Sequence, residues 1–78
     1  MITIKYFGAI AEKAKTEGEA FPFSNQSLQD VINTLDQKHE LSTLSYSIAV
    51  NQKIIQDTKS YLLASNDVVA LLPPFAGG

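Results

Sequence analysis

The sequence predicts a small α+β domain, in which one mixed β-sheet carries a single main amphipathic helix on one face. Three observations lead to this prediction. Alternating strand-forming residues begin the chain, one apolar stripe at helical spacing lies in its middle, and a continuous aliphatic run lies near its end. With 78 residues, of which 45% are hydrophobic, the chain can bury one core and no second one.

The first third of the chain predicts a β-hairpin. Residues 2–7 alternate with a period of two, and both faces carry apolar residues, so we expect this strand at the centre of the sheet. Gly8 ends the strand, and residues 9–15 are long enough for only a short helical turn. Residues 19–23 resume the alternation around Pro22, which cannot donate to a ladder and therefore predicts an edge strand.

The clearest predicted element is a helix over residues 28–39. Its apolar residues recur at i, i+3, i+4 and i+7 and form one stripe, which consists of Leu28, Val31, Ile32 and Leu35. Ser27, followed three residues later by Asp30, resembles a capping box with Asp in place of Glu. We interpret His39, at the end of the helix, as a solvated or capping residue.

The second half of the chain predicts three further strands. Residues 46–50 alternate, Asn51-Gln52 favours a tight turn, and residues 53–55 supply a short hairpin partner. In the polar stretch that follows, the cluster Tyr61-Leu62-Leu63 indicates one helical turn under the sheet. Residues 68–72 form a continuous β-branched and aliphatic run, which predicts a strand buried on both faces.

This order of elements is strand, strand, helix, strand, short strand and strand. A hairpin before the helix and a buried strand after it indicate a mixed sheet whose first and last strands are parallel neighbours at the centre. Such an arrangement is typical of the β-grasp, or ubiquitin-like, architecture.

The composition argues against several classes of function. All six basic residues are Lys and the net charge is −2, which does not favour a nucleic-acid partner. Without cysteine and with one histidine, the chain is expected to bind no metal or cofactor and to supply no catalytic side chain. No apolar stretch approaches the roughly 20 residues of a membrane helix, and no signal peptide is evident, so we expect a cytoplasmic protein without a membrane partner.

The last residues predict a tail distinct from the domain. We expect residues 1–74 to form the β-grasp domain and residues 75–78 to form a flexible Gly-Gly tail. Pro73-Pro74 stops strand pairing and stiffens the exit, and the four residues beyond reach about 13–14 Å when extended. Because Gly77 and Gly78 carry no side chain, this end suits a narrow channel in another protein, where a carboxylate reacts once its oxygen becomes a leaving group.

Three stretches of the sequence carry a resemblance to a known family. They are the start from Met1-Ile2 through Tyr6-Phe7 to Glu12, the run Ala49-Val50-Asn51-Gln52, and residues 67–78 with the ending Pro-Pro-x-x-Gly-Gly. Together they make the chain, over essentially its whole length, similar to the small, sulfur-carrying subunits of molybdopterin synthases. One departure is Ala11, where members often carry Arg, so docking that uses this Arg would need other contacts here.

The resemblance implies a reaction cycle. The Gly78 carboxylate would be adenylated by an E1-like enzyme that uses ATP, and a persulfide donor would then convert it to a thiocarboxylate. Phe75, Ala76 and Gly77 would enter the large subunit with it, and the sulfur would pass to cyclic pyranopterin monophosphate to build the dithiolene that later holds molybdenum. The catalytic side chains would belong to the large subunit, two copies of which pair with two small subunits.

The predicted partner-binding residues lie around the base of the tail. They are Phe7, Leu72, Pro73 and Pro74, with Phe75 as the strongest candidate because no core is available to it beyond Pro74. For Phe7, packing in the core is as well supported as partner binding, and for Leu72 packing in the core is favoured.

Two other functions stay open, namely a sulfur carrier for thiamine or another pathway, and a ubiquitin-like modifier or interaction module. The proline pair favours the molybdopterin pathway over thiamine.

Overall fold

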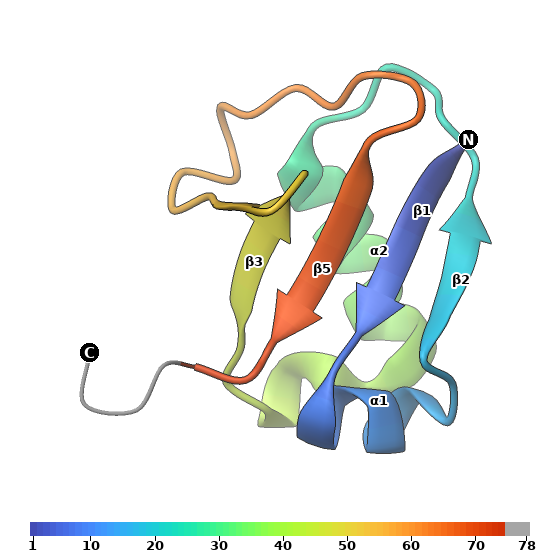
Figure 1. The fold of residues 1–78 in the computed structure, drawn as a ribbon, viewed down its shortest axis with the longest axis vertical. Helices are drawn as coiled ribbons and strands as arrows, with labels where there is room; N and C mark the ends of the chain where they lie inside the picture. The colour runs from blue at the N-terminus through green and yellow to red at the C-terminus, as the bar shows by residue number, and fades with distance from the viewer. Residues whose placement is uncertain (75–78) are drawn as a thin grey trace.

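A computed structural model describes residues 1–74, which form a five-stranded mixed sheet and two α-helices (Figure 1). The strands are β1 (Ile2–Tyr6), β2 (Gly18–Phe21), β3 (Ser47–Val50), β4 (Lys53–Ile54) and β5 (Val68–Leu72). The helices are α1 (Gly8–Ala14) and α2 (Leu28–His39), and a single 3-10 turn spans Leu41–Thr43. The predicted tail, residues 75–78, lies outside the described residues.

The strand order confirms the predicted β-grasp topology. The order across the sheet is β2-β1-β5-β3-β4. β1 pairs antiparallel with β2 and parallel with β5, while β3 pairs antiparallel with both β5 and β4. The first and last strands are therefore parallel neighbours in the middle of the sheet, and both point toward α1 in Figure 1.

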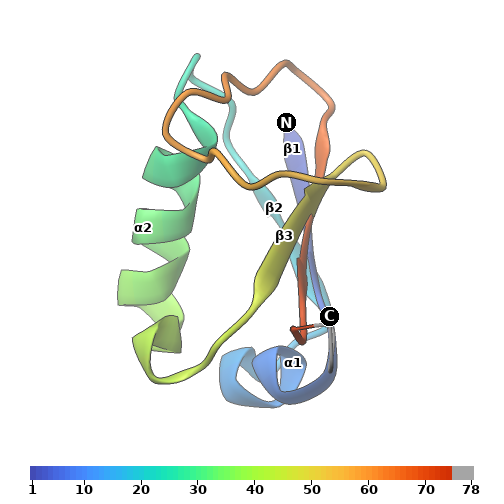
Figure 2. The same ribbon diagram turned by 90° about the vertical axis from the view of Figure 1, so that its left-hand side faces the viewer.

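The core lies between the sheet and α2, which covers one face of the sheet (Figure 2). All four residues of the predicted helical stripe are buried, and they pack on the alternating residues of the central strands. α1 lies at the end where β1 and β5 stop, and it contributes Ile10 and Ala14 to the same core. Neither helix is long and apolar enough to cross a membrane.

The opposite face of the sheet corrects two predictions. β1 was expected to be central with apolar residues on both faces; it is central, but it alternates strictly between buried and exposed residues. β5 was expected to be buried on both faces. In β5, Val69 and Leu71 are buried, whereas Val68, Ala70 and Leu72 are only half-buried. The reason is that both helices pack on the other side or at the end of the sheet, so the aliphatic run keeps one face at the surface.

The segments around the first hairpin differ slightly from the prediction. The expected short turn at residues 9–15 is the seven-residue helix α1, which ends where Lys15 adopts a left-handed conformation with φ 61°. β2 is an edge strand, as predicted, but it stops at Phe21, so Pro22 follows the strand and costs no ladder bond.

The expected helical turn at residues 61–63 is absent. Leu63 is buried, but Leu62 is 74% exposed and forms an isolated antiparallel bridge with Ser27. The backbone carbonyl of Tyr61 accepts a hydrogen bond from the Leu28 N–H at 2.8 Å. The Tyr61 carbonyl thus satisfies an N–H group at the start of α2 that has no partner within the helix, and this contact ties the segment to α2.

Candidate functional site

The chain leaves the end of β5 against the turn between β1 and α1. The Phe7 N–H donates to the Leu71 carbonyl at 3.2 Å. Gly8 adopts φ 58°, and a Cβ added to it would lie 2.8 Å from Cγ of Pro73. Gly8 therefore suits this position in two ways, since it adopts a left-handed conformation without strain and leaves room for the proline ring. Pro73 and Pro74 are both exposed, and the described part of the chain ends at Pro74.

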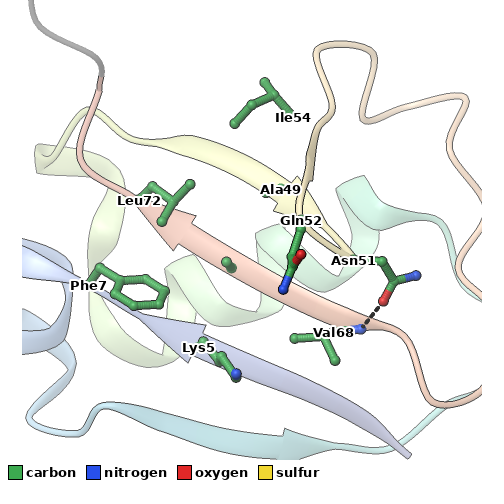
Figure 3. Close-up of a pocket in the computed structure, with 9 residues that line it drawn as sticks. Lys5, Phe7, Ala49, Asn51, Gln52, Ile54, Val68 and Leu72 are labelled. Carbon is green, nitrogen blue, oxygen red and sulfur yellow. Dashed lines mark hydrogen bonds between the residues drawn. The ribbon is translucent and has the colours of Figure 1, made fainter.

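A hollow of about 610 Å³ lies on the uncovered face of the sheet, next to this exit. It is lined by nine residues from four strands and their flanks, which are Lys5, Phe7, Ala49, Asn51, Gln52, Ile54, Val68, Ala70 and Leu72. Figure 3 shows these side chains around β5, with Phe7 and Leu72 toward the end of the strand and Val68 and Asn51 toward its start. The lining is mainly apolar, which is the composition of a binding surface rather than of an ordinary solvated sheet face.

The register of the sheet explains the shape of the hollow. Lys5 lies opposite Ala70, Ala70 lies opposite Ala49, and Ala49 lies opposite Ile54. Small side chains thus occupy the middle of a row that crosses the sheet, and longer ones stand at both ends. We call the nine lining residues the open-face hollow.

The structure brings the predicted partner-binding residues together. Phe7 is 43% exposed and Leu72 is half-buried, and both line the open-face hollow, while Pro73 and Pro74 follow directly. Neither Phe7 nor Leu72 belongs to the main core cluster, contrary to the core packing considered for them. The other predicted site residues, Phe75, Ala76, Gly77 and Gly78, lie outside the described residues.

Sequence reasoning missed most of the hollow itself. Ile54, 44% exposed, and the small residues Ala70 and Ala49 beside it in the row were not singled out. The signal was present in the alternation of the central strands, because once α2 is placed on one face, every second residue must face the other way. Which strands are neighbours, and hence which residues share a row, depends on the register.

Asn51 stabilises the end of the hollow that lies at the start of β5, away from Leu72 and Pro73. Asn51 and Gln52 have φ values of 51° and 71°, as a two-residue hairpin turn of type I′ requires, and the predicted tight turn is confirmed. The Asn51 side chain accepts from the Val68 N–H and donates to Asp67, both at 3.0 Å. The hairpin is therefore fixed to the start of β5.

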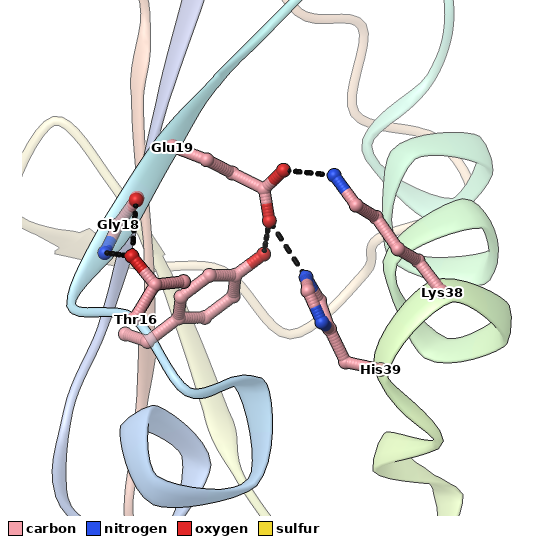
Figure 4. A network of polar contacts seen from close by, with 6 residues as sticks. Thr16, Gly18, Glu19, Lys38 and His39 are labelled. Atoms are coloured by element: carbon pink, nitrogen blue, oxygen red, sulfur yellow. Dashed lines mark hydrogen bonds and ion pairs between the residues drawn. The ribbon is translucent and has the colours of Figure 1, made fainter.

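A second polar cluster lies between the sheet and the end of α2 (Figure 4). The Tyr6 hydroxyl donates to Oε2 of Glu19 at 2.6 Å, Nε2 of His39 lies 2.7 Å from the same oxygen, and Lys38 pairs with Oε1. Burial alone would raise the pKa of Glu19, but the hydrogen bonds from Lys38, Tyr6 and His39 outweigh it and lower that pKa to about 2. Burial, and then the hydrogen bond to Glu19, raise the pKa of Tyr6.

This cluster corrects the interpretation of His39. Its side chain is only 13% exposed and meets the Tyr6 ring edge-on, with ring centroids 5.5 Å apart, so it is not a solvated residue. The acid, the histidine and the tyrosine bind one another and line no part of the open-face hollow. The cluster therefore ties edge strand β2 to α2. Within residues 1–74, no three His, Cys, Asp or Glu residues gather as metal ligands would.

Comparison with known families gives a match over nearly the whole chain. The ThiS family matches residues 4–78. The chain belongs to the ThiS family. It is thus a ubiquitin-like protein of a family of sulfur carriers, and the match extends through the Gly-Gly ending. No curated protein matches the sequence.

Solved structures share the fold of this ThiS-family chain. A protein named as a candidate molybdopterin converting factor subunit 1 of Pyrococcus furiosus has a TM-score of 0.84 at 22% identity, covering 95% of this chain and 97% of that one. Small archaeal modifier protein 1 of Haloferax volcanii has a TM-score of 0.78 at 19% identity, covering 95% and 97%. At these identities the likeness establishes the β-grasp fold alone.

One similar structure has a higher sequence identity. It is the complex of subunits 1 and 2 of the molybdopterin-converting factor of Helicobacter pylori, with 29% identity and a TM-score of 0.72. The match covers 99% of this chain and 97% of that one.

Proposed function

We propose that this chain is the small, sulfur-carrying subunit of a molybdopterin synthase, and that the carboxylate of Gly78 carries the sulfur. The observation that carries this proposal is the full-length match, at 29% identity, to a chain in the structure of the complex of subunits 1 and 2 of the molybdopterin-converting factor of Helicobacter pylori. Membership of the ThiS family and the Pro73-Pro74 pair before the Gly-Gly ending support it.

The proposed loading of sulfur onto Gly78 takes place in three steps. In an E1-like adenylating enzyme, a carboxylate oxygen of Gly78 attacks the α-phosphorus of ATP, and pyrophosphate leaves. The terminal sulfur of a protein persulfide then attacks the acyl carbon, and AMP leaves. A thiol then attacks the donor's sulfur in the resulting S–S bond, forms a disulfide with the donor, and releases the thiocarboxylate. ATP would be bound by the activating enzyme, so the chain itself needs no nucleotide site.

The proposed function also implies that the protein works in the cytoplasm.

Delivery of sulfur would depend on the tail. Phe75, Ala76 and Gly77 would enter a pocket of the large subunit, which supplies the catalytic side chains. The thiocarboxylate of Gly78 would give its sulfur to cyclic pyranopterin monophosphate, and a second loaded tail would supply the other sulfur of the dithiolene. Two small and two large subunits would form the working heterotetramer.

The open-face hollow supplies a surface on which the large subunit can dock. Phe7 and Leu72 line the hollow beside the point where the tail begins, and Pro73 and Pro74 extend the same apolar surface. A partner seated there would hold the base of the tail, because the Gly8–Pro73 contact and the Phe7–Leu71 hydrogen bond fix how the chain leaves β5. Positioning of this kind is what group transfer through a narrow channel requires.

Reconstitution tests the proposal. The thiocarboxylated chain is mixed with the cognate large subunit and cyclic pyranopterin monophosphate, and molybdopterin is measured against the unloaded carboxylate form. We expect product only with the loaded chain, in proportion to two chains per product. Sulfur transfer into a thiamine precursor instead, or conjugation of the tail to lysines of other proteins, would support one of the alternative functions and contradict this one.

A further inference from the structure

The open-face hollow of this chain has an unbalanced charge. The whole chain is acidic, with 8 Asp and Glu residues against 6 Lys. The nine lining residues nevertheless include one cation, Lys5, and no carboxylate. Among residues 1–74, Lys5 forms no ion pair, and the only ion pairs are those of Glu19 with Lys38 and His39. The hollow therefore presents one unmatched positive charge at the side of an apolar floor.

The positions of this charge and of the apolar floor are fixed by the sheet. Lys5 on β1 is the direct neighbour of Ala70 on β5, and Ala70 is the neighbour of Ala49 on β3. Adjacent strands lie about 4.8 Å apart, so the small residues begin one strand away from Lys5 and extend to about 10 Å from it. Gly18 lies on the other side of Lys5 and adds no side chain that would cover it.

We propose that Lys5 selects the protein that docks on the open-face hollow, by pairing with a carboxylate that the docking segment carries beside an apolar anchor. The inference rests on the proposed function and deepens it, because it assigns a chemistry to the docking segment of the large subunit. That segment places an Asp or Glu over Lys5 and an aliphatic or aromatic side chain over Ala70 and Ala49. Its two side chains stand about 5–10 Å apart, a spacing available at i, i+2 on a strand or at i, i+4 on a helix.

The physical basis is the partial loss of water from Lys5 when the apolar floor is covered. An ion pair in full contact with solvent contributes little to binding, whereas one at the border of a covered apolar surface contributes more. A partner without the carboxylate would leave the ammonium group desolvated and unpaired, so Lys5 also disfavours partners that are merely apolar.

Binding of the full chain to the cognate large subunit by titration calorimetry tests the inference. We expect Lys5→Met, which keeps the aliphatic stem, to weaken binding about 5- to 10-fold, and Lys5→Glu to weaken it about 30-fold or more. Lys5→Arg restores affinity to within about 3-fold, because it keeps the charge. Lys59→Glu, in the exposed stretch before Tyr61, changes the net charge by the same amount as Lys5→Glu and is the matched control. We expect it to change affinity less than about 2-fold.

Salt dependence gives a second readout that a purely structural effect would not change. The affinity of the wild-type chain should fall more steeply with added salt than that of Lys5→Met. Since Lys5 is exposed, all variants should keep the wild-type midpoint of thermal unfolding, which circular dichroism measures.

If Lys5→Glu binds as well as Lys59→Glu, or if the salt slopes of wild type and Lys5→Met coincide, the inference is wrong while the proposed function stands. If the wild-type chain does not bind the large subunit, the proposed function fails and this inference with it.

Discussion

The Glu19 carboxylate connects two elements of the domain through three side-chain partners. It binds Tyr6 of β1 together with Lys38 and His39 of α2, and the Glu19 side chain is only 17% exposed. Three donors around one carboxylate stabilise its charged form, which explains why its pKa is lowered to about 2 although burial alone would raise it. Because β2 is an edge strand, this residue connects the edge of the sheet to the end of the helix.

We expect Glu19→Gln to destabilise the fold by about 2–3 kcal/mol at pH 7, because the ordinary pKa of 4.5 falls to about 2 on folding. A lowered folded pKa stabilises above the unfolded value, so this contribution is full above pH 4.5 and is lost as the pH falls toward 2. The difference between wild type and variant should therefore shrink to about 1 kcal/mol at pH 3. Urea denaturation at both pH values measures it.

Glu12→Gln, at an exposed position of α1, is the matched control and should show a difference below about 0.5 kcal/mol at either pH. An equal loss of stability for Glu19→Gln at pH 7 and pH 3 would contradict the ionic role assigned to Glu19.

At the scale of elements, α2 is held at both ends by contacts that the sequence only partly reveals. Ser27 caps its first turn by accepting from the Asp30 N–H at 3.2 Å, as the Ser27–Asp30 spacing predicted. The Tyr61 and Thr58 carbonyls accept from the N–H groups of Leu28 and Gln29, which no local pattern indicates. The loop before β5 thus completes the N-terminus of a helix that lies some thirty residues earlier in the sequence.

Ser27→Ala should therefore destabilise the domain by about 1 kcal/mol, because it removes one acceptor at the N-terminus of α2 while the loop carbonyls remain. Ser27→Asp keeps an acceptor and adds a favourable charge at the positive end of the helix, so it should retain wild-type stability within about 0.5 kcal/mol. Thermal unfolding followed by circular dichroism compares the two. Equal destabilisation by both substitutions would show that the hydroxyl of Ser27 does not act as the cap.

Some features of these elements can be predicted from the sequence, and others cannot. The bounds of α2, the turn at Asn51-Gln52 and the parallel pairing of the first and last strands were all predicted correctly, because each depends on local periodicity or on chain order. The half-buried face of β5 was not, because an aliphatic run looks the same whether one or both of its faces are covered. The contact between His39 and Glu19 was missed as well, because these two residues lie 20 positions apart in the sequence and are brought together only by packing of the helix on the sheet.

At the scale of the whole molecule, the fold presents one apolar face next to the exit of one chain end. α2 and α1 cover one face and one end of the sheet, and the open-face hollow remains on the other face beside Pro73 and Pro74. The sequence alone located Phe7, Leu72 and the two prolines, but the hollow between them exists only because the register aligns Ala70 with Ala49. In the proposed function, the reaction would take place at Gly78 and the domain would supply recognition of the partner.

The most direct test of the sulfur-carrier role is the intact mass of the chain after incubation with its E1-like enzyme, ATP, a persulfide donor and a thiol reductant. We predict a mass increase equal to exchange of one oxygen for one sulfur, located in the C-terminal peptide and dependent on ATP. A chain with one alanine appended after Gly78 should fold normally and fail in the reconstituted conversion of pyranopterin precursor. An unchanged mass with the active cognate enzyme, or precursor conversion by the extended chain, would contradict a mechanism that uses the Gly78 carboxylate.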